Sequence, residues 1–555
     1  METIDFQRDP ARYLHWKLSV DGPVAKLVMD VQEEKPWRPG YPLKLNSYDL
    51  GVDMELADAI QRLRFEQPQV RVLEITSTRD KIFCAGANIY MLQSSTHPFK
   101  VNFCKFTNET RIGLEEYARE SGVRTVAALN GTASGGGYEL AIACDEIHLI
   151  DDGSSAVSFP ETPLLAVLPG TGGLTRLVDK RKIRRDIADV FCTVAEGFRG
   201  GKALKSGLVD YVHARSRFEA KVGERIQQIV AAANAATPAA KAAPSFRDGH
   251  GIRLEPVTSK VDGDTLRYEH VIVQVDAKAR VATLTVHAPK GDEPKTPEEL
   301  LKKGCRAWAI QCARELDDAL LQLRFACDQI GLVVLKTAGD AAKVLAVDAM
   351  LVQHQDHWLV KETILQLGRA LRRLDLTGRS FFAVIEPGSC FAGTLFELAL
   401  AADRSYMLND PERPAHVQLS EVNGGSFPMS HGLSRLKSRF LADPKKADAA
   451  LAVGEPIDAE QALELGLVTF APDDIDWEDE LRVAVEERAS MSPDALTGME
   501  ASLRFAGPES LETKIFGRLS AWQNWIFTRP NATGDEGALS LYGRPERPVF
   551  DWRRT

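Results

Sequence analysis

The chain of 555 residues is poor in the features that mark several large classes of protein. Its eight cysteines include no C-x-x-C pair, so the sequence indicates neither a metal site nor a disulfide framework. Acidic residues outnumber basic ones, which gives a formal net charge of −10 and no basic footprint for nucleic acid. No apolar run approaches the roughly 20 residues that a membrane span needs. We therefore expect neither nucleic acid nor a membrane among the partners.

Two motifs of common enzyme classes are also missing. The histidines form no H-E-x-x-H pattern, and no G-x-G-x-x-G follows an expected strand, so a nicotinamide-binding half is not indicated. The first residues, Met1-Glu-Thr-Ile-Asp-Phe6, are acidic and do not resemble a signal sequence. With 44% hydrophobic and 26% charged residues, the composition is typical of a soluble globular protein, and we expect a cytoplasmic one without a metal.

The most informative segment that is present is a glycine-rich turn. Residues 135–137 are three glycines that precede a helical pattern, and such a turn brings bare backbone N–H groups to a helix N-terminus, where an anion is favoured. Glu139 lies in the first turn of that helix, and Glu161 follows about twenty residues later. Each feature alone also has a purely structural interpretation. Together they predict a paired acid and base beside an anion site, which suits an enolate.

An upstream segment makes the pattern more specific. Residues 72–77 have the composition of a buried strand, and they are followed by Phe83-Cys-Ala-Gly-Ala-Asn-Ile89. The order of these elements resembles the crotonase (enoyl-CoA hydratase/isomerase) superfamily, with its F-x-A-G-A-D-I loop, its G-G-G-C-E-L helix start and its P-E segment. The resemblance implies an α/β fold of ββα spiral modules and an acyl-CoA substrate.

Position by position, the resemblance assigns roles to residues of this sequence. It makes the N–H groups of Ala87 and Gly136 an oxyanion hole for the thioester oxygen, and it makes Glu139 and Glu161 the acid/base pair. We slightly favour Glu161 as the base. Cys104 falls in the stretch that lines the acyl pocket and is a candidate for contact with the substrate. The residues expected near the CoA thioester are Lys44, Leu45, Ala85, Asn88 and Ile89. The sequence departs from the family pattern at Asn88, which replaces Asp, and at Tyr138, which replaces Cys.

The length of the chain points to an internal repeat. Residues 54–65 recur as residues 314–325, and residues 203–209 recur as residues 462–468. We therefore predict two crotonase-like modules. In the second copy the first glycine loop is replaced by residues 345–349 and the glycine triplet by Gly-Thr-Leu, so Glu397 and Glu421 are expected to lack a working oxyanion hole.

The predicted domain organisation has four parts. They are a catalytic module at 1–230, a linker rich in Ala, Pro and Gly at 231–256, a degenerate module at 257–484 and a C-terminal helical region at 485–555. Residues 533–539 resemble the final T-G-D-x-x-E-G helix of the family. Because crotonase modules usually associate, a homodimer is the simplest expectation.

A doubled chain that keeps one site and both glutamates resembles family members that cleave an epoxidised aromatic ring carried by coenzyme A. The resemblance implies the opening of 2,3-epoxybenzoyl-CoA with two waters, in aerobic benzoate degradation, to 3,4-dehydroadipyl-CoA semialdehyde and formate. It requires no metal, flavin or nicotinamide. Two alternatives stay open: an enoyl-CoA hydratase or isomerase acting on another acyl-CoA, and a non-catalytic subunit that binds CoA thioesters.

Overall fold

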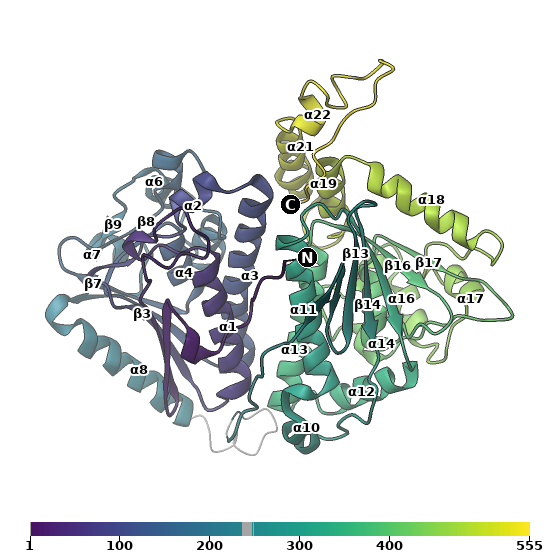
Figure 1. Cartoon of the computed structure of the whole chain (residues 1–555). Helices are drawn as coiled ribbons and strands as arrows, with labels where there is room; N and C mark the ends of the chain where they lie inside the picture. Colours follow the sequence, from purple (N-terminus) through teal and green to yellow (C-terminus); the bar gives the residue numbers. More distant parts are fainter. Residues whose placement is uncertain (1, 236–246, 248) are drawn as a thin grey trace. The chain divides into compact units, whose positions relative to one another are not determined.

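The computed structural model describes residues 2–235, 247 and 249–555, and it divides into two compact units (Figure 1). Residues 5–256 form the first module, and residues 257–555 form the second module together with residues 1–4. Residues 236–246 and 248 of the predicted linker at 231–256 lie outside the described residues. Helix α8 (Phe218–Ala235) extends into its first residues, so the first module continues beyond the predicted boundary at 230.

The first module is built around a six-stranded sheet with the order β1-β2-β3-β5-β7-β10. A β1–β2 hairpin starts the sheet, and the other neighbouring pairs are parallel. Strand β3 is buried along its whole length, which confirms the strand predicted at 72–77. The strands are β1 (Trp16–Asp21), β2 (Val24–Met29), β3 (Val72–Ser77), β5 (Arg124–Leu129), β7 (Glu146–Asp151) and β10 (Tyr211–Ala214).

A second, smaller sheet in this module has the order β4-β6-β8-β9. Its strands are β4 (Lys81–Cys84), β6 (Gly131–Ser134), β8 (Ala156–Ser158) and β9 (Phe198–Arg199). Strands β4, β6 and β8 are parallel, so their carboxyl ends lie at one edge of the sheet. The segments that follow these three ends contain Ala87, Gly136 and Glu161. The small sheet therefore gathers three predicted site residues that are far apart in the sequence.

Helices surround these sheets. In the first module they are α1 (Leu50–Glu66), α2 (Ile89–Ser94), α3 (His97–Ser121), α4 (Gly136–Ala143), α5 (Gly173–Thr175), α6 (Arg185–Thr193), α7 (Gly200–Lys205) and α8. Helix α1 packs against α3, and α3 contacts α4. Among the described residues, no helix is both long and apolar enough to cross a membrane.

The second module has one seven-stranded sheet with the order β11 to β17. Its strands are β11 (Lys260–Asp262), β12 (Thr265–Arg267), β13 (Val271–Asp276), β14 (Val281–His287), β15 (Leu332–Ala338), β16 (Ser380–Ile385) and β17 (Arg404–Met407). Its main helices are α10 (Pro297–Lys303), α11 (Trp308–Phe325), α12 (Ala341–Gln353), α13 (Trp358–Leu376), α14 (Gly393–Ala401), α15 (Arg435–Arg439), α16 (Pro444–Leu451) and α17 (Ala459–Glu464).

The two modules share the hairpin, the parallel strands, the first long helix (α1 and α11) and the helix that carries Glu139 or Glu397 (α4 and α14). Strands β13 and β14 form the hairpin of the second copy, and β14 to β17 run parallel as β2, β3, β5 and β7 do. The copies differ after strand β3 of the first module and its counterpart, strand β15, of the second. Where the first module has β4 and the Ala87 loop, the second has helix α12, so residues 345–349 are helical rather than a loop.

The C-terminal region contains α18 (Trp477–Ser490), α19 (Pro493–Leu503), α20 (Leu511–Lys514), α21 (Ser520–Ile526) and α22 (Pro530–Thr533). Helix α18 starts earlier than the predicted boundary at 485. The final helix expected at 533–539 is not formed, because the chain turns back on itself there. A Cβ atom on Gly534 would lie 2.8 Å from the Pro530 carbonyl oxygen, and one on Gly537 would lie 2.6 Å from it.

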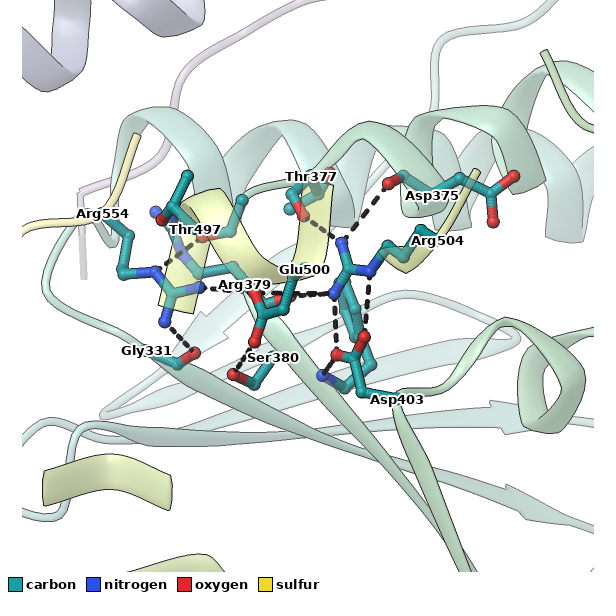
Figure 2. A network of polar contacts seen from close by, with 12 residues as sticks. Gly331, Asp375, Thr377, Arg379, Ser380, Asp403, Thr497, Glu500, Arg504 and Arg554 are labelled. Atoms are coloured by element: carbon teal, nitrogen blue, oxygen red, sulfur yellow. Dashed lines mark hydrogen bonds and ion pairs between the residues drawn. The ribbon is translucent and has the colours of Figure 1, made fainter. Parts of the chain in front are cut away.

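A buried ionic network fastens this region to the sheet of the second module (Figure 2). Its centre is Glu500 of α19, which is 2% exposed. The Glu500 carboxylate accepts from Arg554 Nη2 at 2.7 Å and from Arg488 Nη1 at 3.1 Å. Arg554 also donates to the carbonyls of Gly378 and Gly331, at 2.9 and 3.3 Å, beside strands β16 and β15. The last residues of the chain are therefore part of the core of this module.

We expect Arg554→Ala to lower the free energy of unfolding by about 3 kcal/mol, because it leaves the Glu500 carboxylate buried without one of its cations. Arg553→Ala is the matched control, since Arg553 is more exposed and pairs with Asp551 near the surface. That change should cost less than about 1 kcal/mol. Urea unfolding followed by circular dichroism measures both, and equal losses in the two variants would contradict the role given to the network.

Candidate active site

The glycine triplet forms the start of helix α4. Gly135 has φ 53° and ψ −127°, a conformation that residues with a side chain rarely adopt. A Cβ atom on Gly136 would lie 2.1 Å from the Tyr48 hydroxyl, and one on Gly137 would lie 2.2 Å from the Cys84 carbonyl oxygen. Each glycine is thus required by a close neighbour. As the first residue of α4, Gly136 has no partner for its N–H within the helix, so this group can receive an anion.

The loop that contains Ala87 lies directly against this turn. Gly86 has φ 89°, and a Cβ atom there would be 2.7 Å from the Gly136 nitrogen. Tyr48 fixes the loop through two backbone hydrogen bonds: its N–H donates to Gly86 at 2.9 Å, and its carbonyl accepts from Asn88 at 2.8 Å. The structure therefore places the loop that contains Ala87 against the turn that contains Gly136.

Glu139 is buried beneath the turn and is held by backbone groups. Its Oε1 atom accepts from the N–H of Thr171 and from that of Gly173, each at 2.8 Å. Burial raises the pKa of Glu139, while these two donors and the positive charge of Arg111 act against the rise. The sequence had indicated Glu139 but not its two donors, because backbone groups leave no signature in a residue pattern.

Glu161 begins the segment after β8 and lies against the turn. A Cβ atom on Gly135 would be 2.3 Å from Glu161 Oε1, so the carboxylate rests against the glycine. Its Oε2 atom is buried and has no hydrogen-bond partner among the described residues. Burial, with a further contribution from the charge of Glu139, raises the pKa of Glu161 to about 7. The structure thus places the two carboxylates beside one turn in unequal surroundings.

Cys104 of α3 lies near the segment of residues 169–173, Pro-Gly-Thr-Gly-Gly, and near Glu139. A Cβ atom on Gly170 would be 3.4 Å from Cys104 Sγ. Burial and the charge of Glu139 raise the pKa of the thiol to about 11, so Cys104 is a neutral thiol at physiological pH.

The residues expected near the thioester lie around the Ala87 loop. Lys44, Leu45 and Ile89 are exposed, and the Ala85 N–H donates to the Leu45 carbonyl at 3.2 Å, which ties the two segments together. The Asn88 side chain is buried and engaged in the fold. It caps α2 by accepting from Met91 at 2.9 Å, and it donates to the Pro42 carbonyl at 2.7 Å.

Three further residues beside the site were not indicated by the motifs: Tyr48, Asp53 and Arg111. Arg111 lies in the apolar stripe of α3, in helical register with Phe103 and Leu114, and it pairs with Asp53 of α1. A charged residue in an apolar stripe is a signal that sequence inspection could have used. Within the described ranges, no three His, Cys, Asp or Glu side chains gather as metal ligands would.

The corresponding turn of the second module is occupied by a side chain. Thr394 stands where the first module has Gly136, and its N–H donates to Asp348 Oδ2 at 2.8 Å. Asp348 comes from α12, the helix that replaces the Ala87 loop, and it also accepts from the Ser420 hydroxyl at 3.0 Å. Burial raises the pKa of Asp348 to about 7. The protein's own carboxylate thus sits where the first module presents bare N–H groups.

The second pair of glutamates is likewise engaged or displaced. Glu397, at the position of Glu139, accepts from Arg435 at 2.9 Å and from Asn423 at 2.8 Å, and it is fully buried. Glu421, at the position of Glu161, is exposed. Glu397 is thus held by structural contacts, while Glu421 is open to solvent.

Comparison with known proteins connects this geometry to a family. Residues 40–248 match the family described as enoyl-CoA hydratase/isomerase. Over 554 residues the chain is 52% identical to benzoyl-CoA-dihydrodiol lyase of Aromatoleum evansii, an alignment that covers 100% of this chain and 98% of that protein. The similarity to the Aromatoleum protein therefore extends over both modules.

Shorter similarities are found with proteins of single-module size. Carnitinyl-CoA dehydratase of Proteus mirabilis is 28% identical over 40% of this chain and 77% of its own length. A solved structure of an enoyl-CoA hydratase from Geobacillus kaustophilus is 32% identical, covers 39% of this chain and 74% of that chain, and has a TM-score of 0.34.

We expect Asp348→Ala to lower the free energy of unfolding by about 2 kcal/mol, because it leaves the donors of Thr394 and Ser420 without their acceptor. Formate has the size of the missing carboxylate, so it should raise the melting temperature of this variant more than that of the wild type. Scanning calorimetry in formate, with chloride at the same ionic strength as the control, measures the effect. Equal stabilisation of both proteins would show that the turn does not hold the anion.

Proposed function

The chain belongs to the enoyl-CoA hydratase/isomerase family, also called the crotonase superfamily, and from that premise we propose that it opens the ring of 2,3-epoxybenzoyl-CoA. The reaction consumes two waters and yields 3,4-dehydroadipyl-CoA semialdehyde and formate, as a step of aerobic benzoate degradation. The support is the similarity, over both modules, to a protein named benzoyl-CoA-dihydrodiol lyase. The enzyme is a lyase that acts on a CoA thioester and, by its family, needs no other cofactor.

The observation that carries the mechanism is the pair of glutamates in unequal surroundings beside the Gly135–Gly137 turn. Burial raises the pKa of Glu139, but two backbone N–H groups and the charge of Arg111 oppose the rise and favour the ionised form. Glu161 has one oxygen without a partner and a pKa raised to about 7, so it keeps a proton to near neutral pH. We assign the base to Glu139 and the acid to Glu161, the reverse of the preference drawn from sequence.

In the proposed reaction the thioester oxygen is held by the N–H groups of Ala87 and Gly136. Glu139 takes a proton from the water that attacks the strained ring, and Glu161 gives a proton to the epoxide oxygen. The two N–H groups stabilise the negative charge that gathers on the thioester oxygen as the ring opens. A second water is added as one ring carbon leaves as formate. Cys104, as a neutral thiol beside Glu139, lines the pocket for the ring.

The surface of the C-terminal region supports a further proposal, that the protein is a homodimer. Leu511, Phe516 and Phe527 are 75%, 74% and 53% exposed. Large apolar side chains grouped in one region mark a surface that another protein covers, and a second copy of the chain is the simplest partner. We place the enzyme in the cytoplasm.

Turnover of 2,3-epoxybenzoyl-CoA, followed by formate release, should fall by about 10² to 10⁴-fold in Glu139→Gln and in Glu161→Gln. Glu421→Gln is the matched control in the second module and should keep wild-type turnover, because Glu421 is exposed and the turn of that module is already bonded to Asp348. Hydration of crotonyl-CoA without formate release would instead make the chain an enoyl-CoA hydratase. Binding of both thioesters without turnover would make it a binding subunit.

The pH profile of kcat/KM provides a separate test of the assignment. Glu161 as the acid must be protonated, so activity should be present below pH 7 and should be lost as the pH rises through about 7. Glu139 as the base must be ionised, so activity should also be lost toward low pH. Stopped-flow assays in buffers of constant ionic strength measure both limbs. A profile that rises through pH 7 to a plateau would reverse the assignment.

A further inference from the structure

Helices α1 and α3 pack against each other and carry two buried ion pairs of the same kind. Asp53 of α1 pairs with Arg111 of α3, and Arg64 of α1 pairs with Glu116 of α3. Both arginine side chains are 1% exposed. Each guanidinium also lies over a tyrosine ring: Arg111 is 5.1 Å from the ring centroid of Tyr48, and Arg64 is 5.4 Å from that of Tyr117. The two pairs are therefore close structural equivalents.

Of the two ion pairs, the Asp53–Arg111 pair is the one next to the Gly135–Gly137 turn. The Tyr48 ring, which Arg111 covers, presses its hydroxyl against Gly136, where a Cβ atom would be 2.1 Å away. The charges of Arg111 and Glu139 act on each other: Arg111 lowers the pKa of Glu139, and Glu139 favours the charged form of Arg111. The cation thus lies behind the turn and is buried, so its field is weakly screened.

Three polar atoms of the ion pair and of the tyrosine beside it have no hydrogen-bond partner among the described residues. They are the Tyr48 hydroxyl, Asp53 Oδ2 and Arg111 Nε, all buried. The pairing with Asp53 therefore leaves part of the hydrogen-bonding capacity of Arg111 unused. An ion pair of this kind is often no more stabilising than apolar residues of the same volume, so stability alone does not account for it.

We propose that Arg111 is a positioning residue for catalysis, whose buried positive charge stabilises the negative charge on Glu139 and on the thioester oxygen at Gly136. The inference rests on the proposed ring-opening function and deepens it. Negative charge appears at both places along the reaction, and a fixed cation behind them is oriented before the reaction starts. Asp53 holds the guanidinium in place, and Tyr48 separates it from the turn.

The groups that face Glu139 come from four elements. They are Arg111 and Cys104 of α3, Tyr48 just before α1, Glu161 after β8, and the segment of Thr171 and Gly173, which acts through two N–H groups and the Thr171 side chain. Of these, Arg111 alone carries a positive charge. Removing it should therefore raise the pKa of Glu139 and leave the other contacts of the carboxylate in place.

The test is a double variant that removes both charges together, Arg111→Met with Asp53→Asn, so that no unpaired charge stays buried. We expect kcat for 2,3-epoxybenzoyl-CoA to fall at least about tenfold, KM to change by less than about threefold, and the acidic limb of kcat/KM to move to higher pH. Arg64→Met with Glu116→Gln is the matched control on the same two helices. It should alter stability to a similar degree and leave kcat and the pH profile at wild-type values.

A second measurement does not depend on ring opening. A β-ketoacyl-CoA such as acetoacetyl-CoA forms an enolate whose ultraviolet absorbance reports how strongly the site stabilises negative charge. The bound enolate fraction should fall in the Arg111/Asp53 variant and stay unchanged in the control. If the wild type releases no formate from the epoxide but the enolate fraction still falls, the proposed reaction is wrong and the role of Arg111 stands.

A charge-preserving variant covers the case in which the double variant does not fold. Arg111→Lys keeps the cation and should keep the acidic limb and the enolate fraction close to those of the wild type. The proposal is overturned if Arg111→Lys shifts the acidic limb, or if the folded double variant keeps the wild-type profile and enolate fraction.

Discussion

The structure of the site depends on how closely the backbone can approach itself at the Gly135–Gly137 turn. A methyl group at any of the three positions would overlap a neighbouring atom, and the neighbours are the groups that build the site: Glu161, Tyr48 and the end of β4. The parallel strands of the small sheet determine where these segments end, and the bare turn lets them meet. Chain geometry, rather than any one side chain, therefore brings the N–H groups and both carboxylates together.

In the second module, a carboxylate of the protein itself occupies the corresponding turn. Asp348 accepts from the Thr394 N–H at 2.8 Å, as a negatively charged oxygen of a ligand would accept from the Gly136 N–H. In the second copy an N–H group of this turn is thus bonded to a carboxylate of the protein itself. The copies differ in what precedes the turn. A helix that carries an aspartate stands in place of the glycine loop, and the C-terminal end of this copy is held through Glu500 and Arg554.

Much of this arrangement was predictable from sequence, and the part that was not has a physical reason. The strand at 72–77, the repeat and the glutamates at 139 and 161 follow from residue type and spacing. The donors to Glu139 were missed because they are backbone groups of Thr171 and Gly173. The helix at 345–349 was missed because a comparison between copies assumes the same local structure in each. The expected helix at 533–539 fails because Gly534 and Gly537 pack on Pro530, a contact that no helical pattern reveals.

Glu139 and Glu397 show that position alone does not make a carboxylate reactive. Both lie in the first half of an equivalent helix and both are buried, yet Glu397 is neutralised by Arg435 and bonded by Asn423, so it has little capacity to exchange a proton. Glu139 is bonded by backbone N–H groups, which fix its orientation without supplying a full opposite charge. Its nearest cation acts from behind Tyr48 rather than through direct contact. A carboxylate held in this way is oriented and partly stabilised, and it keeps the basicity that proton transfer requires.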